Sequence, residues 1–200
     1  TLLLAGGVKN PLRLMLSGVI VAVIFGALSS LVALSAPDIL QSMQTFLLGS
    51  TSFVSWNACV VMLIVLVIGL LVSIAQSRVL DGLTLGELTA QSLGLNLKFT
   101  RLCLIAVMSL TTGAAVAQIG LIAFVGLVAP HLARSLVRVS HARLIFLSGL
   151  IGAGLLLAAD ILARVLIAPQ ELPVGVLTAI LGGGYLFWLM YNGRKEGTFK

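Results

Sequence analysis

The sequence predicts an all-α fold: a polytopic transmembrane helical bundle of about six spans. Of the 200 residues, 60% are hydrophobic and 9% are charged, and the mean hydropathy is +1.19. That composition leaves too little polar surface to cover a water-soluble globule of this size. The apolar residues also fall into long uncharged runs, separated by stretches that carry arginine and lysine. These features predict one transmembrane domain over residues 1–200, surrounded by lipid.

The basic residues set the number of crossings. A spanning helix needs about 20 mostly apolar residues, and arginine and lysine collect in cytoplasmic loops. Four basic clusters are present: Lys9 and Arg13; Arg78, Lys98 and Arg101; Arg134, Arg138 and Arg143; Arg194, Lys195 and Lys200. If each cluster is cytoplasmic, the chain crosses twice between consecutive clusters, and both ends of the segment are cytoplasmic. The predicted spans are 12–34, 54–77, 102–118, 120–138, 144–166 and 173–192.

Three of these spans carry small residues on one helix face, a pattern typical of helix contacts inside a bilayer. We therefore expect these faces to pack against protein. The residues are Gly18, Ala22, Gly26 and Ser30 in the first span, Gly149 and Ala153 in the fifth, and Gly175, Ala179 and Gly183 in the sixth.

The cytoplasmic loop at 78–101 is long enough to hold a helix of its own. Thr84 followed by Glu87 forms a possible capping box, and Gly94 suits a helix C-terminus. Apolar positions lie between them at Leu85, Leu88 and Leu93. The pattern predicts a short helix across the inner face. It fits either an interfacial helix resting on lipid headgroups or a docking surface for a cytoplasmic partner.

The third and fourth spans share one uncharged run, from 102 to 133, so the chain must turn near Gln118–Gly120. A re-entrant loop in place of two complete crossings is the alternative. Pro130 removes a backbone donor and is expected to kink its helix. His131 follows it near the cytoplasmic end of the span.

On the outer face, Arg164 is the only basic residue that the predicted spans leave. Asp160 precedes it by four residues, which suits an ion pair along one helix. Alternatively, the guanidinium is offered to an acidic partner outside the membrane, since arginine binds carboxylates in a fork geometry. Both interpretations hold if Arg164 exchanges Asp160 for a carboxylate of the partner when the partner docks.

Other kinds of site are not indicated. Without an intramembrane pair of acids, a metal-ligand spacing or a nucleophile beside a base, we expect no enzyme activity, no cofactor and no metal site. Neither His131 nor His141 has a carboxylate close in sequence, and Cys59 and Cys103 are expected to be small buried residues. The scattered basic residues do not form the aromatic-interleaved patch that favours nucleic acid.

Three motifs follow one another along the chain. The pattern L-G-E-x-T-A-x-S-L-G is carried by Leu85, Gly86, Glu87, Thr89, Ala90, Ser92, Leu93 and Gly94. The pattern G-x-I-x-F-V-G-L-V-x-P-H is carried by Gly120, Ile122, Phe124, Val125, Gly126, Leu127, Val128, Pro130 and His131. The patterns A-D-x-x-A-R and E-L-P-V-G are carried by Ala159, Asp160, Ala163, Arg164, Glu171, Leu172, Pro173, Val174 and Gly175. Over essentially all 200 residues the chain resembles the FecCD family, the permease subunits of ATP-binding-cassette (ABC) importers for iron-siderophores, haem and vitamin B12.

The resemblance implies the last six spans of a ten-span permease, with the preceding four absent from this sequence. It implies a protein of the bacterial plasma (inner) membrane that pairs with a second permease copy and sits on ABC ATPase subunits. A periplasmic or lipoprotein solute-binding protein would deliver a metal chelate to its outer mouth. A secondary transporter or channel, not driven by ATP, is the alternative function.

The resemblance also assigns roles to residues. Coupling to the ATPase falls to Leu85, Gly86, Glu87, Thr89, Ala90, Leu93 and Gly94. Docking of the binding protein falls to Arg164 and Glu171. Helix kinks and the pathway wall fall to Gly120, Phe124, Gly126, Pro130, His131, Pro173 and Gly175.

Overall fold

The computed structural model describes residues 11–35, 37–52, 54–137, 140–168 and 170–193; the basic residues Lys9, Arg138, Arg194, Lys195 and Lys200 lie outside these ranges. Within them the chain forms helices joined by turns and short extended stretches, which confirms the all-α class. The helices are α1 (Pro11–Ser35), α2 (Pro37–Leu48), α3 (Trp56–Ala75), α4 (Ser77–Leu83), α5 (Glu87–Ser92), α6 (Leu97–Ile119), α7 (Val125–Leu136), α8 (His141–Val165) and α9 (Val174–Gly193).

Among the described residues, five helices are long and apolar enough to cross a membrane: α1, α3, α6, α8 and α9. They correspond to five of the six predicted spans. The start of α6 differs most, because it begins at Leu97 and not near 102. Asn96 caps this helix by accepting a hydrogen bond from the Phe99 amide at 3.1 Å, so the helix begins before the charged side chains that limited the apolar run.

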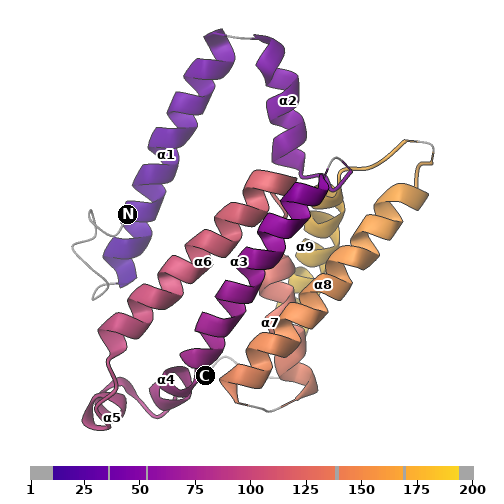
Figure 1. Cartoon of the computed structure of the whole chain (residues 1–200). Coiled ribbons are helices and arrows are strands. Elements are labelled where there is room, and N and C mark those ends of the chain that lie inside the picture. The colour runs from indigo at the N-terminus through magenta and orange to yellow at the C-terminus, as the bar shows by residue number, and fades with distance from the viewer. Residues whose placement is uncertain (1–10, 36, 53, 138–139, 169, 194–200) are drawn as a thin grey trace.

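The predicted span at 120–138 needs correction, because it is not one continuous helix. Residues 120–123 are non-helical, and α7 has 12 residues. A helix of that length extends roughly 18 Å, short of the roughly 30 Å hydrocarbon core. Figure 1 shows that the segment still returns along the bundle, from the end of α6 to the start of α8. It runs this course as an extended stretch followed by a short helix.

Helices α3 and α6 lie side by side, and α7, α8 and α9 pack together next to them (Figure 1). Small residues allow this packing: a Cβ on Gly69 of α3 would lie 2.7 Å from a methyl carbon of Thr111 on α6. The buried core around α8 and α9 is likewise built from small and medium-sized side chains, namely Ala159, Ala163, Val174 and Leu177. Large apolar side chains mostly face outward, as expected where lipid is the solvent.

The predicted small-residue faces do not all pack against protein. The first is not packed, since Gly18 and Gly26 have open space around them in the described part of the chain. Helix α1 stands apart from the other long helices and is joined to them through α2, which was not predicted (Figure 1). On α8 the contact with α7 uses Gly152, while Gly149 has no neighbour within 4 Å among the described residues.

The bundle has two distinct ends. Helices α4 and α5, the end of α7 and the start of α8 lie at one end, which we call the α5 end (Figure 1). The loop between α2 and α3, the end of α6 and the turn between α8 and α9 lie at the opposite end, which we call the far end (Figure 1). Helix α8 runs from one end to the other.

Candidate functional site

Three glycines bring three backbone segments into direct contact near the far end. Gly49 follows α2, Gly120 follows α6, and Gly175 lies in the first turn of α9. Hydrogen bonds join the segments: the Ser50 amide donates to the Ile119 carbonyl at 2.9 Å, and the Gly175 amide donates to the Gly49 carbonyl at 3.3 Å. We call Gly49, Gly120 and Gly175 the glycine crossing.

Space explains why these positions are glycine. A Cβ on Gly175 would lie 2.2 Å from the Leu48 carbonyl oxygen and 2.6 Å from that of Leu121. A Cβ on Gly120 would lie 2.2 Å from the Phe46 carbonyl oxygen. Gly120 and Gly175 were singled out from their motifs, whereas Gly49 was missed because it stands outside them. The sequence around Gly49 carries no pattern that marks it.

The extended stretch after Gly120 ends at Phe124, the only non-glycine residue with a positive φ (68°) in the described part of the chain. Its side chain lies against α9, where a Cβ on Gly182 would come within 2.3 Å of the Phe124 Cβ. The irregular backbone therefore packs on protein, as it must at membrane depth. Pro130 lies within α7, and Pro173 immediately precedes α9. Gly126 has no neighbour within 4 Å among the described residues.

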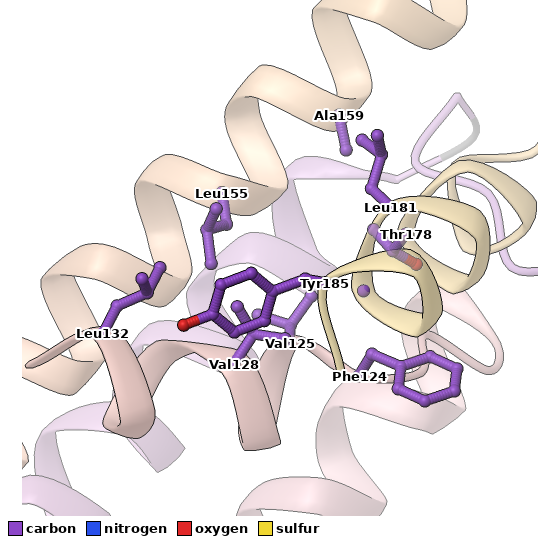
Figure 2. Close-up of a pocket in the computed structure, with 10 residues that line it drawn as sticks. Phe124, Val125, Val128, Leu132, Leu155, Ala159, Thr178, Leu181 and Tyr185 are labelled. Carbon is purple, nitrogen blue, oxygen red and sulfur yellow. The ribbon is translucent and has the colours of Figure 1, made fainter. Parts of the chain in front are cut away.

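A largely apolar cavity of about 200 Å³ lies between α7, α8 and α9, with Phe124, Thr178 and Tyr185 in its wall. The ring of Tyr185 extends from α9 toward Leu132 and Leu155 (Figure 2). The Tyr185 hydroxyl lies 2.9 Å from His131 Nδ1 and forms a hydrogen bond with it. His131 of α7 and Tyr185 of α9 thus meet through one polar contact, and Tyr185 was not predicted.

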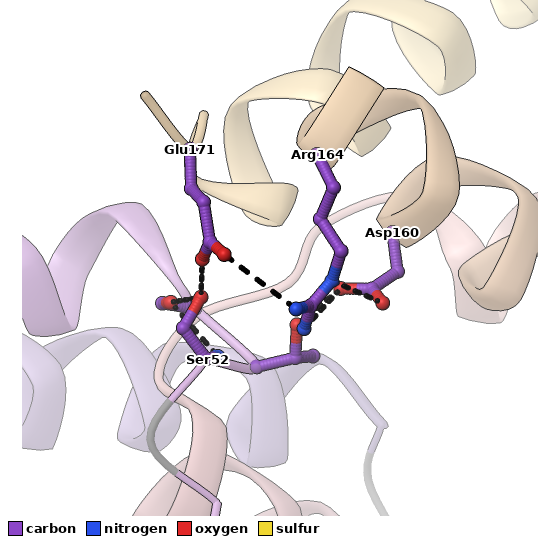
Figure 3. A network of polar contacts seen from close by, with 6 residues as sticks. Ser52, Asp160, Arg164 and Glu171 are labelled. Atoms are coloured by element: carbon purple, nitrogen blue, oxygen red, sulfur yellow. Dashed lines mark hydrogen bonds and ion pairs between the residues drawn. The ribbon is translucent and has the colours of Figure 1, made fainter. Parts of the chain in front are cut away.

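At the far end, Arg164 is the centre of a polar cluster. Arg164 Nε lies 3.0 Å from Asp160 Oδ2, which forms the ion pair considered above, and Nη1 lies 3.6 Å from Glu171 Oε1. Thr51 donates a hydrogen bond to Asp160, and Ser52 donates one to Glu171 (Figure 3). Arg164 remains 45% exposed, so its guanidinium is open to solvent although both acids contact it. We call these five residues the far-end cluster.

The structure therefore brings together Arg164 and Glu171, which the motifs assigned to docking. Thr51 and Ser52 come from the loop after α2 and were missed. A serine and threonine pair in a loop is common, so their sequence carries no signal for this contact. Their hydroxyls donate to the two acids, while the Arg164 guanidinium supplies the positive charge of the cluster.

The predicted helix in the 78–101 loop is present as α5, but its start needs correction. Gly86, with φ of 104°, is the residue that precedes α5, and Thr84 instead ends α4 by donating to the Asp81 carbonyl at 2.7 Å. The capping box therefore does not form. Glu87 pairs with Arg101 Nη2 of its own chain at 3.1 Å.

The end of α5 agrees with the prediction. Gly94 has φ of 75°, its amide donates to the Gln91 carbonyl at 2.9 Å, and the Leu95 amide donates to the Ala90 carbonyl at 3.2 Å. These two bonds are those of a Schellman motif. Ala90 is fully buried, while three leucines of the segment face outward: Leu85, Leu88 and Leu93.

A second contact at the α5 end was missed. Asp81 Oδ1 accepts the His141 backbone amide at 3.0 Å and lies 2.5 Å from His141 Nδ1. Hydrogen bonds from the His141 backbone and ring lower the pKa of Asp81 below its usual value, so this carboxylate is charged at neutral pH. No carboxylate lies close to His141 in sequence, and Asp81 is 60 positions away, so motif spacing alone did not indicate this contact.

The remaining candidate metal-binding side chains do not lie close together in the described part of the chain. Among the described residues, no group of three or more histidine, cysteine, aspartate or glutamate side chains is placed to hold a metal ion. Cys103 is half-buried, but Cys59 is exposed, so the expectation of burial was wrong for Cys59. Cys59 lies in α3 among apolar side chains that face outward.

Comparisons with known proteins match this architecture. The model of the FecCD transport family matches residues 1–192. The hemin transport system permease protein HmuU of Yersinia pestis is 37% identical over 95% of this chain. The Fe(3+) dicitrate transport system permease protein FecD of Escherichia coli (strain K12) is 37% identical over 92% of it. The chain spans 57% and 58% of the lengths of these two relatives.

A solved structure also matches the fold. It is an inward-facing conformation of a metal-chelate type ABC transporter, and it aligns with a TM-score of 0.85 and 31% sequence identity. The alignment covers 92% of this chain and 60% of that one.

Proposed function

Because the chain belongs to the FecCD transport family, we propose that it is part of the permease of an ABC importer in the bacterial inner membrane. ATP hydrolysis takes place on a separate ATPase subunit at the α5 end, and a solute-binding protein docks at the far end. In this orientation the α5 end is cytoplasmic. A second permease copy completes the pathway.

The cargo is an iron chelate or a related metal chelate. The names of the two relatives, which refer to hemin and to ferric dicitrate, support this class. The largely apolar wall of the cavity between α7, α8 and α9 offers few polar groups that would select one chelate over another. Recognition of the individual chelate therefore belongs to the binding protein.

The exposed surface of α5 carries the proposal. Leu88 is 83% exposed on a short helix whose other side is fixed, since Ala90 is buried and Glu87 is paired with Arg101. An exposed leucine on a rigid helix is suited to a complementary apolar groove on a partner. This supports a refinement of the coupling set: Leu88, which lies at a variable position of the motif, makes the central contact, and Glu87 positions α5.

The test is co-purification of the ATPase with the permease, together with uptake of radioactive ferric chelate into proteoliposomes. Leu88→Asp places a charge in the apolar contact, and we expect at least a tenfold loss of both signals with normal membrane insertion. Leu136→Asp is the matched control, because Leu136 is also exposed (71%) at the α5 end but lies outside α5. Normal ATPase binding by Leu88→Asp would contradict the proposal, and uptake without ATP would favour a secondary transporter.

A further inference from the structure

The start of α8 is capped by a residue from another helix. The first amides of a helix have no partner within it, and a side chain at the preceding position usually accepts one of them. Ser140 occupies that position but makes no such bond among the described contacts. Asp81 of α4 takes its place, since its Oδ1 accepts the His141 amide at 3.0 Å and contacts the His141 ring.

Helix α4 also packs against the segment that contains α5. A Cβ on Gly82 of α4 would lie 2.7 Å from Cδ1 of Leu95, so the two segments are in close contact there. Leu95 in turn closes α5 through its bond to the Ala90 carbonyl. The two short helices therefore form one packed unit, which Asp81 ties to α8.

Helix α8 connects this unit to the far-end cluster. It has 25 residues, which corresponds to a length of roughly 37 Å. It is one continuous helix from His141 to Val165, without proline although Ser148 and Gly149 lie within it, so a displacement at His141 is passed along the helix. Asp160 and Arg164 lie in its last two turns, where they meet Thr51 and Glu171.

We infer that Asp81 is a positioning residue that joins the α4–α5 unit to α8 and carries movement of α5 to the far-end cluster. The inference rests on the proposed function and adds to it a residue pair and a route through one helix. Coupling between two binding sites is reciprocal. Nucleotide bound at the ATPase therefore changes the affinity of the binding protein for the far end, and this change passes through the Asp81–His141 contact.

The test measures the Kd of the binding protein for the transporter, reconstituted with its ATPase subunits, with and without a non-hydrolysable ATP analogue. Asp81→Ala removes both contacts, and we expect it to reduce the nucleotide-dependent ratio of Kd values at least threefold, toward one. Asp81→Asn keeps an oxygen that accepts the His141 amide, so it should restore most of the ratio. Ser140→Ala is the matched control and should keep the wild-type ratio, because Ser140 makes no cap bond in the described structure.

The outcomes separate the two proposals. If Asp81 only stabilises the fold, Asp81→Ala lowers the yield of transporter but leaves the ratio unchanged, and the inference is overturned while the proposed function stands. A wild-type chain that binds no ATPase overturns both. Where Asp81→Ala fails to assemble, His141→Ala decides: it keeps the backbone amide but loses the ring contact, so the ratio should fall part of the way toward one, and a wild-type ratio in this variant overturns the inference.

Discussion

At the residue scale, the glycine crossing has no room for a single methyl group. The atoms nearest to a Cβ on Gly175 are backbone carbonyls of Leu48 and Leu121, and these cannot move aside as a flexible side chain would. At Gly175 glycine serves close approach alone, whereas Gly49 and Gly120 also have a positive φ, which L side chains rarely adopt. The three residues therefore fix how the ends of α2 and α6 meet the start of α9.

We predict that Gly175→Ala lowers the free energy of unfolding by about 1–3 kcal/mol, the usual cost of overpacking. Gly184→Ala is the control on the same helix, because Gly184 has no neighbour within 4 Å among the described residues. Alanine is favoured over glycine in a helix by up to about 1 kcal/mol, so the control should be neutral or stabilising. Thermal unfolding in detergent measures both, and an equal Tm for the two variants would refute the packing argument.

A second residue-scale prediction concerns Arg164. Arg164→Glu places a third carboxylate beside Asp160 and Glu171, so it should weaken docking of the binding protein more than Arg164→Ala does. The measurement is the Kd for the binding protein. An acid-to-lysine change on that protein should rescue Arg164→Glu. If the exchange of charges in Asp160→Arg with Arg164→Glu alone restored binding, Arg164 would serve only its intrahelical pair.

At the element scale, α5 depends on its ends more than on its length. It has 6 residues, and isolated helices of this size are not stable in water. The Schellman motif at Gly94, the buried Ala90 and the Glu87–Arg101 pair hold it. Each of these contacts orients the exposed Leu88.

We predict that Gly94→Ala loosens α5, because a left-handed backbone costs alanine about 1–2 kcal/mol. Asparagine tolerates this conformation better, so Gly94→Asn should have a smaller effect. Amide hydrogen exchange over residues 87–95 is the measurement: we expect roughly fivefold to thirtyfold faster exchange for Gly94→Ala, following from that free energy. Equal exchange in the two variants would show that Gly94 does not control the helix end.

The sequence predicted the helices better than it predicted their breaks. Long apolar runs and basic residues located α1, α3, α8 and α9 within a few residues. Hydropathy failed at 120–138, because it counts apolar residues and does not register the positive φ angles of Gly120 and Phe124. The site was predictable only where its residues lie close together in sequence, as Asp160 and Arg164 do. The Asp81–His141 contact and the hydroxyls of Thr51 and Ser52 depend on long-range folding.

For the whole molecule, the passage formed by the non-helical residues after Gly120 and by α7 decides how the chain is oriented in the membrane. Five spanning helices alone would place the two ends of the chain on opposite sides of the membrane. We propose that the return of the chain through residues 120–136 supplies a sixth passage, so that Pro11 and Gly193 lie on the same side of the membrane. The basic residues described at the α5 end, such as Arg78 and Arg143, favour the cytoplasm for that side.

We predict that, in a variant whose native cysteines are replaced, a cysteine at Gln170 reacts with an impermeant thiol reagent from outside the cell. Cysteines at Gln91 and Ser140 should react only after the membrane is opened. All three positions are exposed in the structure, so a lack of labelling reflects sidedness and not burial. Labelling of Gln170 only from the cytoplasm would reverse the assigned orientation.

The glycine crossing also has a consequence for the order of biosynthesis. Residues 120–124 are synthesised before α9, yet the Leu121 carbonyl packs against Gly175 and Phe124 packs against Gly182. A non-helical stretch is stable within lipid only when protein surrounds it. This passage therefore reaches its final place only once α9 has left the ribosome and entered the membrane. Until then, the backbone of residues 120–124 lacks the protein surface of α9 that it packs against in the finished fold.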